Sequence, residues 1–568
     1  MRGERLLVGV MAALAAGIAL LIAGSVLDLV PHVTDSVSYL FQGRILASGA
    51  LYAPPPALPM LFGHENVLLT ATRWCSIYPP GWPLLLALGW LVHAPWLVSP
   101  LLLALAVVGV WLAGRRLYDA PTGLVAGAAL ACSPFALLMA GDAMAHVPAL
   151  CATVWCLAEM AGASRRSSAA LCRGGGSDLA AAAAAAEGAA AAAAAADIGA
   201  GRIAGPERAP AAGVRKHLVA AGLLGGFALL IRPLTAAALL APAVIWCAIE
   251  LARRRRQDGQ LRAASPASAG AGRLEWLWIG LGAAPCLLAL AAYDAAVFGG
   301  PFVTGYALYE PQRFAHAGGA LEPAAVALLR NLPWYLRHLN GCLWGFPCGD
   351  LLLLVPLLWA RPRRADDAVL AACAASLVLA HCFYFYGDVI YSGPRFAFES
   401  LGPLALLAAR SLLTLRASLV SLLERMRGLS AGTRRTLRLA LTGAGVCMLL
   451  VFPLGRRLPA QMLHHAQWYL AQSAAPLAAA ARAGVGDEAL VFVAGTPWCY
   501  SSFFLANDLH PATARRVYVR DFPPLRSAAM RLYPRHEVWV ARVVVEIPDP
   551  RANPDVARPL ELSWQRIR

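Results

Sequence analysis

The sequence predicts an all-α polytopic membrane protein of about eleven transmembrane helices, followed by a small C-terminal α/β domain outside the membrane. Of the 568 residues, 59% are hydrophobic and 14% are charged, whereas soluble domains contain about 45–50% apolar and about 25% charged residues. The apolar residues form runs long enough to cross a bilayer. Lysine and arginine lie in short blocks between these runs, which is typical of cytoplasmic loops.

The first helix is expected at residues 6–30. This apolar run is too long for the hydrophobic region of a signal peptide, so we expect it to be retained, with the N-terminus in the cytoplasm. Residues 31–80 are expected to form a large first outer loop. Residues 82–93 are too few to span, and predict a helix that lies at the interface or tilts into the bundle. The other spans are expected at 96–114, 120–140, 144–161, 217–231, 234–251, 274–298, 351–360 with the residues before it, 368–385, 396–415 and 439–454.

Residues 163–216 form a low-complexity, alanine-rich segment with basic residues on both sides. Equal positive flanks indicate that both ends stay in the cytoplasm, so we expect a cytoplasmic insert, part helical and part disordered. A second outer loop is expected at 302–345. The transmembrane domain is thus predicted at 1–455, and the extracytoplasmic α/β domain at 456–568.

The C-terminal prediction rests on β-rich runs at 489–493, 516–519 and 537–545, which polar and proline-rich stretches separate. The formal charge of +16 does not indicate a nucleic-acid partner, because the basic residues do not cluster on one solvated face. The thirteen cysteines show no metal-ligand spacing. Cys342 and Cys348 fall in the second outer loop, where a disulfide is an alternative to free thiols if the compartment is oxidising.

Asp35 lies just past the outer end of the first helix and is the first candidate for chemistry. The residues after it predict a short amphipathic helix that holds Tyr39 and Arg44 one and two turns from the acid. Further along the same loop, Tyr78 precedes two prolines and a tryptophan-containing apolar run. An acid at a membrane edge is often only solvated, and that alternative stays open for Asp35.

Asp142 is a second acid, at the outer end of the third helix, and His146 follows it by one helical turn, the spacing at which two side chains share a face. The alternative is a helix-capping Asp beside a hydrogen-bonded His. A divalent metal held by Asp35, Asp142 and His146 is considered, although no dense ligand cluster requires one; no other cofactor is expected.

Arg232 and Arg395 each adjoin a proline at an outer helix end. An arginine near bilayer depth costs about 2.5 to 3.5 kcal/mol on insertion scales, so it usually faces a cavity or a partner. Both are predicted to bind a lipid phosphate, and the alternative is that they snorkel to the interface. Glu399, one turn from Arg395, is expected to neutralise and orient that arginine or to contact substrate.

Taken together, these motifs resemble the lipid-phosphate-sugar-dependent glycosyltransferases of the GT-C class, a glycosyltransferase 39-like superfamily that includes protein O-mannosyltransferases and the aminoarabinose transferase that modifies lipid A. The resemblance covers residues 1–455. It is carried by the Asp35 to Tyr39 spacing, by Tyr78 and the prolines after it, by Asp142 as the second outer acid, and by the stretches 298–306 and 391–403. Tyr78 stands where some relatives have Lys or His.

The resemblance implies a GT-C-like membrane enzyme that moves a hexose or pentose from a polyprenyl-phosphate sugar to an envelope glycan, glycolipid or protein. High Ala, Arg and Gly content suggests a bacterial source, and hence the inner membrane. A phosphate leaving group needs no general acid, so one carboxylate suffices. We expect Asp35 as the general base, Arg395 with Arg232 as the phosphate clamp, Asp142, Tyr39 and His146 at the acceptor or sugar, and inversion at the anomeric carbon.

Two other functions fit a chain of this kind. A transporter or flippase of lipid-linked saccharides is expected to carry ionisable residues near helix midpoints and related halves, and neither is clear in the sequence. A structural or assembly protein acting through the C-terminal domain would leave the first outer loop without a task.

Overall fold

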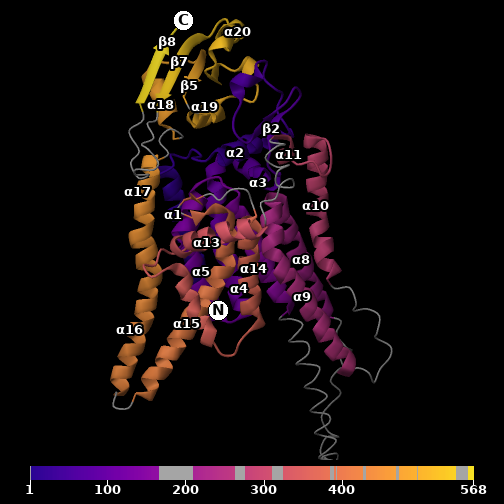
Figure 1. The fold of residues 1–568 in the computed structure, drawn as a ribbon, viewed down its shortest axis with the longest axis vertical. Helices are drawn as coiled ribbons and strands as arrows, with labels where there is room; N and C mark the ends of the chain where they lie inside the picture. The colour runs from indigo at the N-terminus through magenta and orange to yellow at the C-terminus, as the bar shows by residue number, and fades with distance from the viewer. Residues whose placement is uncertain are drawn as a thin grey trace, which may run out of the picture.

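The computed structural model describes residues 2–164, 209–261, 276–309, 324–383, 389–391, 393–426, 430–468, 473–495, 497–544 and 561–568. Most of the alanine-rich insert expected at 163–216 therefore lies outside the described residues. In the described part the chain forms a helical bundle with a small sheet at one end (Figure 1). We call this end the sheet end and the opposite end the arginine end.

The bundle is built from helices that are long and apolar enough to cross a membrane. Within the described residues there are nine: Arg2–Ser25, Pro95–Leu117, His146–Ser164, Gly213–Ile231, Pro233–Arg253, Leu277–Phe298, Ala365–Cys382, Arg395–Arg425 and Ala431–Ala466. The helices α5 (Ala120–Ala131) and α6 (Pro134–Gly141) are together long and apolar enough for a tenth span, with a 54° bend between them. The bend falls where Ser133 caps α6 by accepting the amide N–H of Ala136 at 3.4 Å. The predicted polytopic fold is confirmed.

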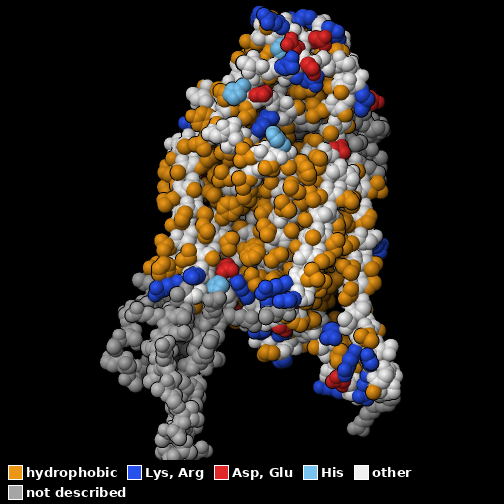
Figure 2. Space-filling model, turned by 180° about the vertical axis from the view of Figure 1, so that it is seen from behind, with side chains coloured by type: hydrophobic (Ala, Val, Ile, Leu, Met, Phe, Trp, Pro, Cys, Tyr) orange, Lys and Arg blue, Asp and Glu red, His pale blue; other side chains and the backbone are white. Residues whose placement is uncertain are grey.

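A broad hydrophobic band covers the face of these helices that Figure 2 shows, and a row of Lys and Arg marks its lower edge. Such a band is the surface that a membrane protein presents to lipid. The chain is therefore a multi-pass membrane protein.

The structure of residues 351–360 differs from the predicted span. It is a 3-10 helix, η4 (Asp350–Trp359), and its ten residues cover only about 20 Å at about 2 Å per residue, less than the ~30 Å hydrocarbon core. Pro356 lies inside it and cannot donate to a helical ladder. The predicted span therefore does not form one continuous helix of membrane-crossing length.

The crossing itself is nevertheless present. The helix before it, α10 (Leu277–Phe298), ends at the sheet end. The next long helix, α14 (Ala365–Cys382), begins at the arginine end, where Asp367 accepts the hydroxyl of Tyr118 at 2.6 Å. Between them α13 (Ala324–Cys342) packs on the bundle within the expected second outer loop, so α13 and η4 together return the chain.

The disulfide considered between Cys342 and Cys348 is not formed. Both thiols are free. Cys342 is buried at the end of α13, whereas Cys348 is exposed, so the two side chains face different surroundings.

The first outer loop is folded rather than irregular. It consists of α2 (Thr34–Ala47), an antiparallel hairpin of β1 (Val67–Leu69) and β2 (Trp74–Ser76), and α3 (Gly81–Leu91). The eleven residues of α3 agree with the expected non-spanning helix. A Cβ added at Gly81 would lie 2.7 Å from the backbone of Leu230, so the start of α3 rests directly against the end of α8 (Ala209–Ile231).

The C-terminal residues form the predicted α/β structure. Its sheet has the strand order β6-β5-β7-β8, with β5 (Ala489–Ala494) parallel to β6 (Arg516–Arg520) and to β7 (Glu537–Val544), and β8 (Glu561–Arg566) antiparallel to β7. The helices α18 (Ala475–Arg482), α19 (Ser501–Ala506) and α20 (Arg526–Leu532) complete it.

This sheet unit shares one hydrophobic core with the first outer loop. The ring of Phe41 on α2 lies 5.1 Å from that of Phe504 on α19 and 4.8 Å from that of Trp74 on β2, centre to centre. At the end of α2, the guanidinium of Arg44 donates to the carbonyls of Leu505 at 3.0 Å and Asn507 at 2.6 Å. The helix that begins with Asp35 is thus fastened at its other end to the sheet unit.

Replacing Arg44 with Met is expected to loosen this attachment. The change removes two charge-assisted hydrogen bonds, each worth about 1.5–3 kcal/mol, and leaves two carbonyls unpaired. We expect amide hydrogen exchange in residues 501–509 to become at least about tenfold faster. The matched control is Arg531→Met on the exposed part of α20; equal exchange in both variants would contradict a tether at Arg44.

Candidate active site

A cavity of about 970 Å³ lies at the sheet end of the bundle. Segments that are far apart in the sequence form its walls, among them the start of α2, the loop around Asn66, the residues around Tyr78, the turn between α8 and α9 (Pro233–Leu261), the last turns of α10, the residues around Tyr306, and the 3-10 helix η5 (Arg395–Ser400). The cavity is therefore a product of the tertiary fold rather than of one motif.

Asp35 and Arg395 meet at the polar end of this cavity. The Oδ2 of Asp35 lies 2.5 Å from Nη1 of Arg395, and its Oδ1 accepts the side-chain amide of Asn66 at 2.7 Å. The two side chains are 14% and 7% exposed. Asp35 stands in the first turn of α2, where the helix dipole favours a negative charge. The result is a carboxylate held by one cation and one amide, with open space beside it.

Asn66 reaches Asp35 from an unusual backbone conformation. Its φ is +60°, a left-handed value that Asn adopts more readily than most residues. The carbonyl of Asn66 accepts the hydroxyl of Ser38 at 2.5 Å and the amide of Ile77 at 3.2 Å, which fixes the loop against α2 and the hairpin.

Arg232 is held by a second, buried acid. Its Nε lies 3.4 Å from Oε1 of Glu399, and the same oxygen lies 3.1 Å from Nδ1 of His146. Glu399 and His146 are fully buried behind the cavity, whereas Arg232 lines it. Because Pro233 follows, Arg232 stands at the break between two helices instead of inside one.

The two arginines flank one aromatic ring. The guanidinium carbons of Arg395 and Arg232 lie 4.8 Å and 6.0 Å from the centre of the Phe396 ring. Both guanidinium groups reach the same cavity. Paired guanidinium forks match the oxygens of a phosphate, which they bind with charge-assisted hydrogen bonds.

An aromatic cluster borders the arginines. The ring of Tyr78 lies 4.3 Å from that of Tyr39 and 5.5 Å from that of Tyr306, centre to centre. Burial raises the pKa of the Tyr39 and Tyr78 hydroxyls well above the usual range, so both stay protonated. This wall offers apolar ring faces and hydroxyl donors together.

Another part of the cavity lining is apolar apart from Asp294 on α10. It is formed by Leu234 on α9 and by Leu287, Leu290 and Ala291 on α10. Leu234 and Leu287 are 49% and 45% exposed on the hydrophobic band. The cavity thus has a charged end near the membrane surface and an apolar side that continues to the lipid-facing surface.

Close helix packing leaves this side of α10 available. A Cβ added at Gly222 on α8 would overlap the carbonyl oxygen of Ile279 on α10, so the two helices touch through their backbones. Because α10 packs on α8 through the face that contains Ile279, the residues on the other faces of α10 turn to the cavity and to lipid.

The fold was compared with known proteins. No protein-family model and no curated protein matches the sequence. The solved structure of ArnT from Cupriavidus metallidurans in the apo state superposes with a TM-score of 0.52 at 14% identity, covering 93% of this chain and 92% of that chain. ArnT is an aminoarabinose transferase of the GT-C class.

The chain has the GT-C fold. Two further structures are similar over most of this chain. ArnT from Cupriavidus metallidurans bound to undecaprenyl phosphate gives a TM-score of 0.45 at 15% identity and covers 94% of this chain and 92% of that chain. The archaeal oligosaccharyltransferase AglB from Archaeoglobus fulgidus, in complex with an inhibitory peptide and a dolichol-phosphate, gives 0.43 at 12% identity and covers 94% and 69%.

On this GT-C fold, the residues singled out in the sequence fall into three groups. Five line the cavity: Asp35, Tyr39, Tyr78, Arg232 and Arg395. His146 and Glu399 lie behind it and contact each other. The structure does not bring Asp142 or Arg44 into the lining: Asp142 packs beside the site, and Arg44 donates to carbonyls of the sheet unit.

Asp142 is buried between α6 and the next span. Its carboxylate accepts the hydroxyl of Tyr391 at 2.5 Å and the amide of Ala143 at 2.6 Å. Burial raises the pKa of Asp142 to about 6, although both hydrogen bonds oppose the shift. Asp142 thus joins α6 to the segment before Arg395.

Asp142→Asn is expected to stabilise the protein at neutral pH. Because the folded pKa lies above the unfolded value of 3.8, the stability that protonation contributes is present at about pH 4 and is lost as pH rises through about 6. The full shift corresponds to about 2–3 kcal/mol. Melting in detergent should therefore favour the variant over wild type by more at about pH 7.5 than at about pH 5. A constant difference would contradict the raised pKa of Asp142.

The cavity also contains polar residues that sequence reasoning missed, namely Glu65, Asn66, Thr235, Asp294, Tyr309 and His381. Asp294 had a usable signal, because an acid within an apolar span usually faces a cavity. Tyr306 belongs to the stretch 298–306, although it was not named as a site residue. Asn66 lies in a loop with no pattern to mark it.

The metal site considered at Asp35, Asp142 and His146 is not assembled. Asp35 faces the Arg395 cation, and His146 turns its Nδ1 to Glu399. No group of three or more His, Cys, Asp or Glu side chains among the described residues is placed to hold a metal ion. These residues therefore do not fit a divalent metal, and no step is derived through one.

Proposed function

We propose that this protein is a membrane glycosyltransferase that moves a sugar from a polyprenyl-phosphate sugar to an acceptor at the sheet end. The observation that carries the proposal is the cavity itself: Asp35, Arg395 and Arg232 share its polar end, and its apolar side continues along α10 to the lipid-facing surface. A ligand that suits both parts has a phosphate head, a sugar and a hydrocarbon tail.

The orientation follows from the distribution of charge. Arg115 and Arg116 end α4 (Val98–Leu117), and Arg364 lies nearby, 5.2 Å from the ring of Tyr118. Basic residues at helix ends mark the cytoplasmic side. We therefore place the arginine end in the cytoplasm, with the N-terminus, and the cavity and sheet unit outside. In a bacterium this membrane is the inner membrane.

The chemistry follows from the charges in the cavity. Asp35 accepts the proton of an acceptor hydroxyl or amine as that atom attacks the anomeric carbon. The bond from the anomeric carbon to the phosphate oxygen breaks, its electron pair stays on that oxygen, and polyprenyl phosphate leaves. Arg395 and Arg232 stabilise the charge that develops on the phosphate. Attack opposite the leaving phosphate inverts the anomeric carbon.

We also propose roles for groups that line the cavity or lie behind it. Glu399 neutralises Arg232 and fixes the direction of its guanidinium, and His146 orients Glu399. Tyr39, Tyr78 and Tyr306 offer ring faces and hydroxyls to the sugar. The ArnT structure with undecaprenyl phosphate and the AglB structure with dolichol-phosphate show that proteins of related fold bind such lipids. The acceptor is an envelope glycan, glycolipid or protein.

The test is a transfer assay in proteoliposomes that carry a radiolabelled undecaprenyl-phosphate hexose or pentose and an envelope extract as acceptor. We expect acceptor-dependent release of undecaprenyl phosphate and movement of the label to the acceptor. A flippase would instead move the donor between leaflets with the phosphate bond intact, and an assembly protein would do neither; either result would refute the proposal.

A further inference from the structure

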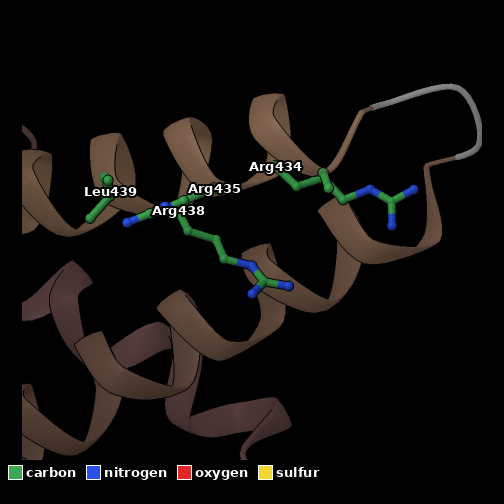
Figure 3. A pocket seen from close by; sticks show the side chains of 5 residues that line it. Arg434, Arg435, Arg438 and Leu439 are labelled. Carbon is green, nitrogen blue, oxygen red and sulfur yellow. The ribbon is translucent and has the colours of Figure 1, made fainter.

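The helices α15 (Leu401–Arg425) and α16 (Ala431–Leu450) form a hairpin that projects from the arginine end of the bundle (Figure 1). A second cavity, of about 410 Å³, lies at its tip, far from the candidate active site. It is lined by Ala431, Arg434, Arg435, Arg438 and Leu439, and the arginine side chains extend beside the turn of the hairpin (Figure 3).

The positive charge of this cavity is poorly compensated by the protein. Residues 401–450 contain seven arginines and a single acid, Glu424. Glu424 pairs with Arg438 at 2.5 Å. Arg434 and Arg438 are four residues apart, a spacing at which like charges repel on a helix.

Helix geometry adds to the positive potential. Arg434 and Arg435 lie in the first turns of α16, where the unpaired amide groups and the helix dipole are already positive. Cations at this end destabilise a helix unless an anion offsets them. Within the described residues the Nε of Arg434 is buried without a hydrogen-bond partner, and its Nη2 makes only a long contact to the carbonyl of Met426, at 3.4 Å.

The position of the cluster identifies the class of anion. Leu439 follows directly and is 65% exposed, and it begins the apolar run that continues through α16. Leu449 is the one buried residue within α16, so this helix meets lipid along most of its length. The arginines therefore directly precede the apolar part of α16, on its arginine-end side.

We propose that this second cavity binds the headgroup phosphate of an anionic phospholipid from the leaflet at the arginine end. The guanidinium groups of Arg434 and Arg435 donate to the phosphate oxygens, and the acyl chains lie along the apolar surface of α16. One turn further into the membrane, the Nε of Arg416 donates to the hydroxyl of Thr442 at 3.2 Å and joins the two helices. The bound lipid fills the space at the tip and holds the hairpin together.

The test uses the full chain in detergent, titrated with phosphatidylglycerol and followed by native mass spectrometry. The test variant is Arg434→Gln with Arg435→Gln, which leaves the Arg438–Glu424 pair intact. The matched control is Arg361→Gln with Arg363→Gln, which removes two charges from another loop at the same end. We expect the first variant to bind phosphatidylglycerol at least about tenfold more weakly than wild type, and the control to bind as wild type does.

Two further arms separate the outcomes. A variant with Arg434→Lys and Arg435→Lys keeps the charge but lacks the forked donors, so an intermediate affinity is expected. Phosphatidylcholine and inorganic phosphate distinguish a lipid site from a site for any phosphate. The proposal would be overturned by an equal loss of affinity in the matched control or by unchanged affinity in the test variant. It would also be overturned if inorganic phosphate prevents binding of phosphatidylglycerol and the site shows no preference for the lipid.

Discussion

Asp35→Asn is expected to lower the rate of sugar transfer by about 10²–10⁴-fold, the usual contribution of a general base. Asparagine has the size of aspartate and can still accept the amide of Asn66, but it cannot take a proton from the acceptor. The donor should still bind, because its phosphate is held by the arginines. Initial rates of label transfer measure the first effect, and titration with undecaprenyl phosphate measures the second.

The matched control for Asp35 is Asp487→Asn, an exposed acid of the sheet unit whose side chain is 86% exposed. It should transfer sugar at the wild-type rate. Wild-type rates in a folded, membrane-inserted Asp35→Asn protein would remove Asp35 from the mechanism, and a loss of donor binding in that variant would show a binding role instead.

Arg395→Gln is expected to have the second largest effect, because Arg395 interacts with two partners in turn. In the structure it neutralises Asp35. In the proposed reaction the donor phosphate competes for the same guanidinium, which frees the Asp35 carboxylate to accept a proton. Loss of this group should lower kcat/KM by about 10²–10³-fold, as loss of a single oxyanion donor does in other enzymes.

The design for Arg395 separates phosphate binding from folding. Arg395→Lys keeps a positive charge without the fork and should fall between wild type and Arg395→Gln in affinity for undecaprenyl phosphate. Arg531→Gln on α20 removes an exposed arginine and should change neither rate nor affinity. A folded Arg395→Gln protein that binds undecaprenyl phosphate as wild type does would contradict the clamp.

The sequence was informative about the bundle because hydropathy is a local property. Runs of about twenty apolar residues and arginine blocks predicted most spans to within a few residues. The same reasoning failed at η4 and α13, because η4 has only ten residues and α13 is amphipathic rather than apolar, so neither registers alone as a span.

The candidate site was predictable only in part. Asp35 and Arg395 stand out as charged residues at helix ends, yet they are 360 positions apart, and no local pattern predicts their contact. Arg44 shows the opposite case: helical spacing correctly placed it on the same helix as Asp35, but its partners at the end of α19 lie more than 460 positions away. Spacing gives the face of a helix and not what packs on that face.

The acid and histidine behind the cavity illustrate a second limit. Glu399 was expected to neutralise and orient Arg395, its neighbour by one turn, or to contact substrate, and the structure pairs it with Arg232 and His146. Helical neighbours are only one set of partners in a bundle, and a buried carboxylate takes whichever cation the packing brings closest.

A polyprenyl-phosphate analogue with a diazirine in its first isoprene units tests the central claim most directly, because it reports where the lipid of the donor lies. After irradiation and digestion, the adducts are expected on the part of α10 that contains Leu287, Leu290 and Ala291; undecaprenyl phosphate should compete for them, and they should fall at least about tenfold in Arg395→Gln. A lipid-phosphate site in this cavity would be contradicted if the adducts spread evenly over the lipid-facing helices, α16 included, and if neither the competitor nor Arg395→Gln changes them.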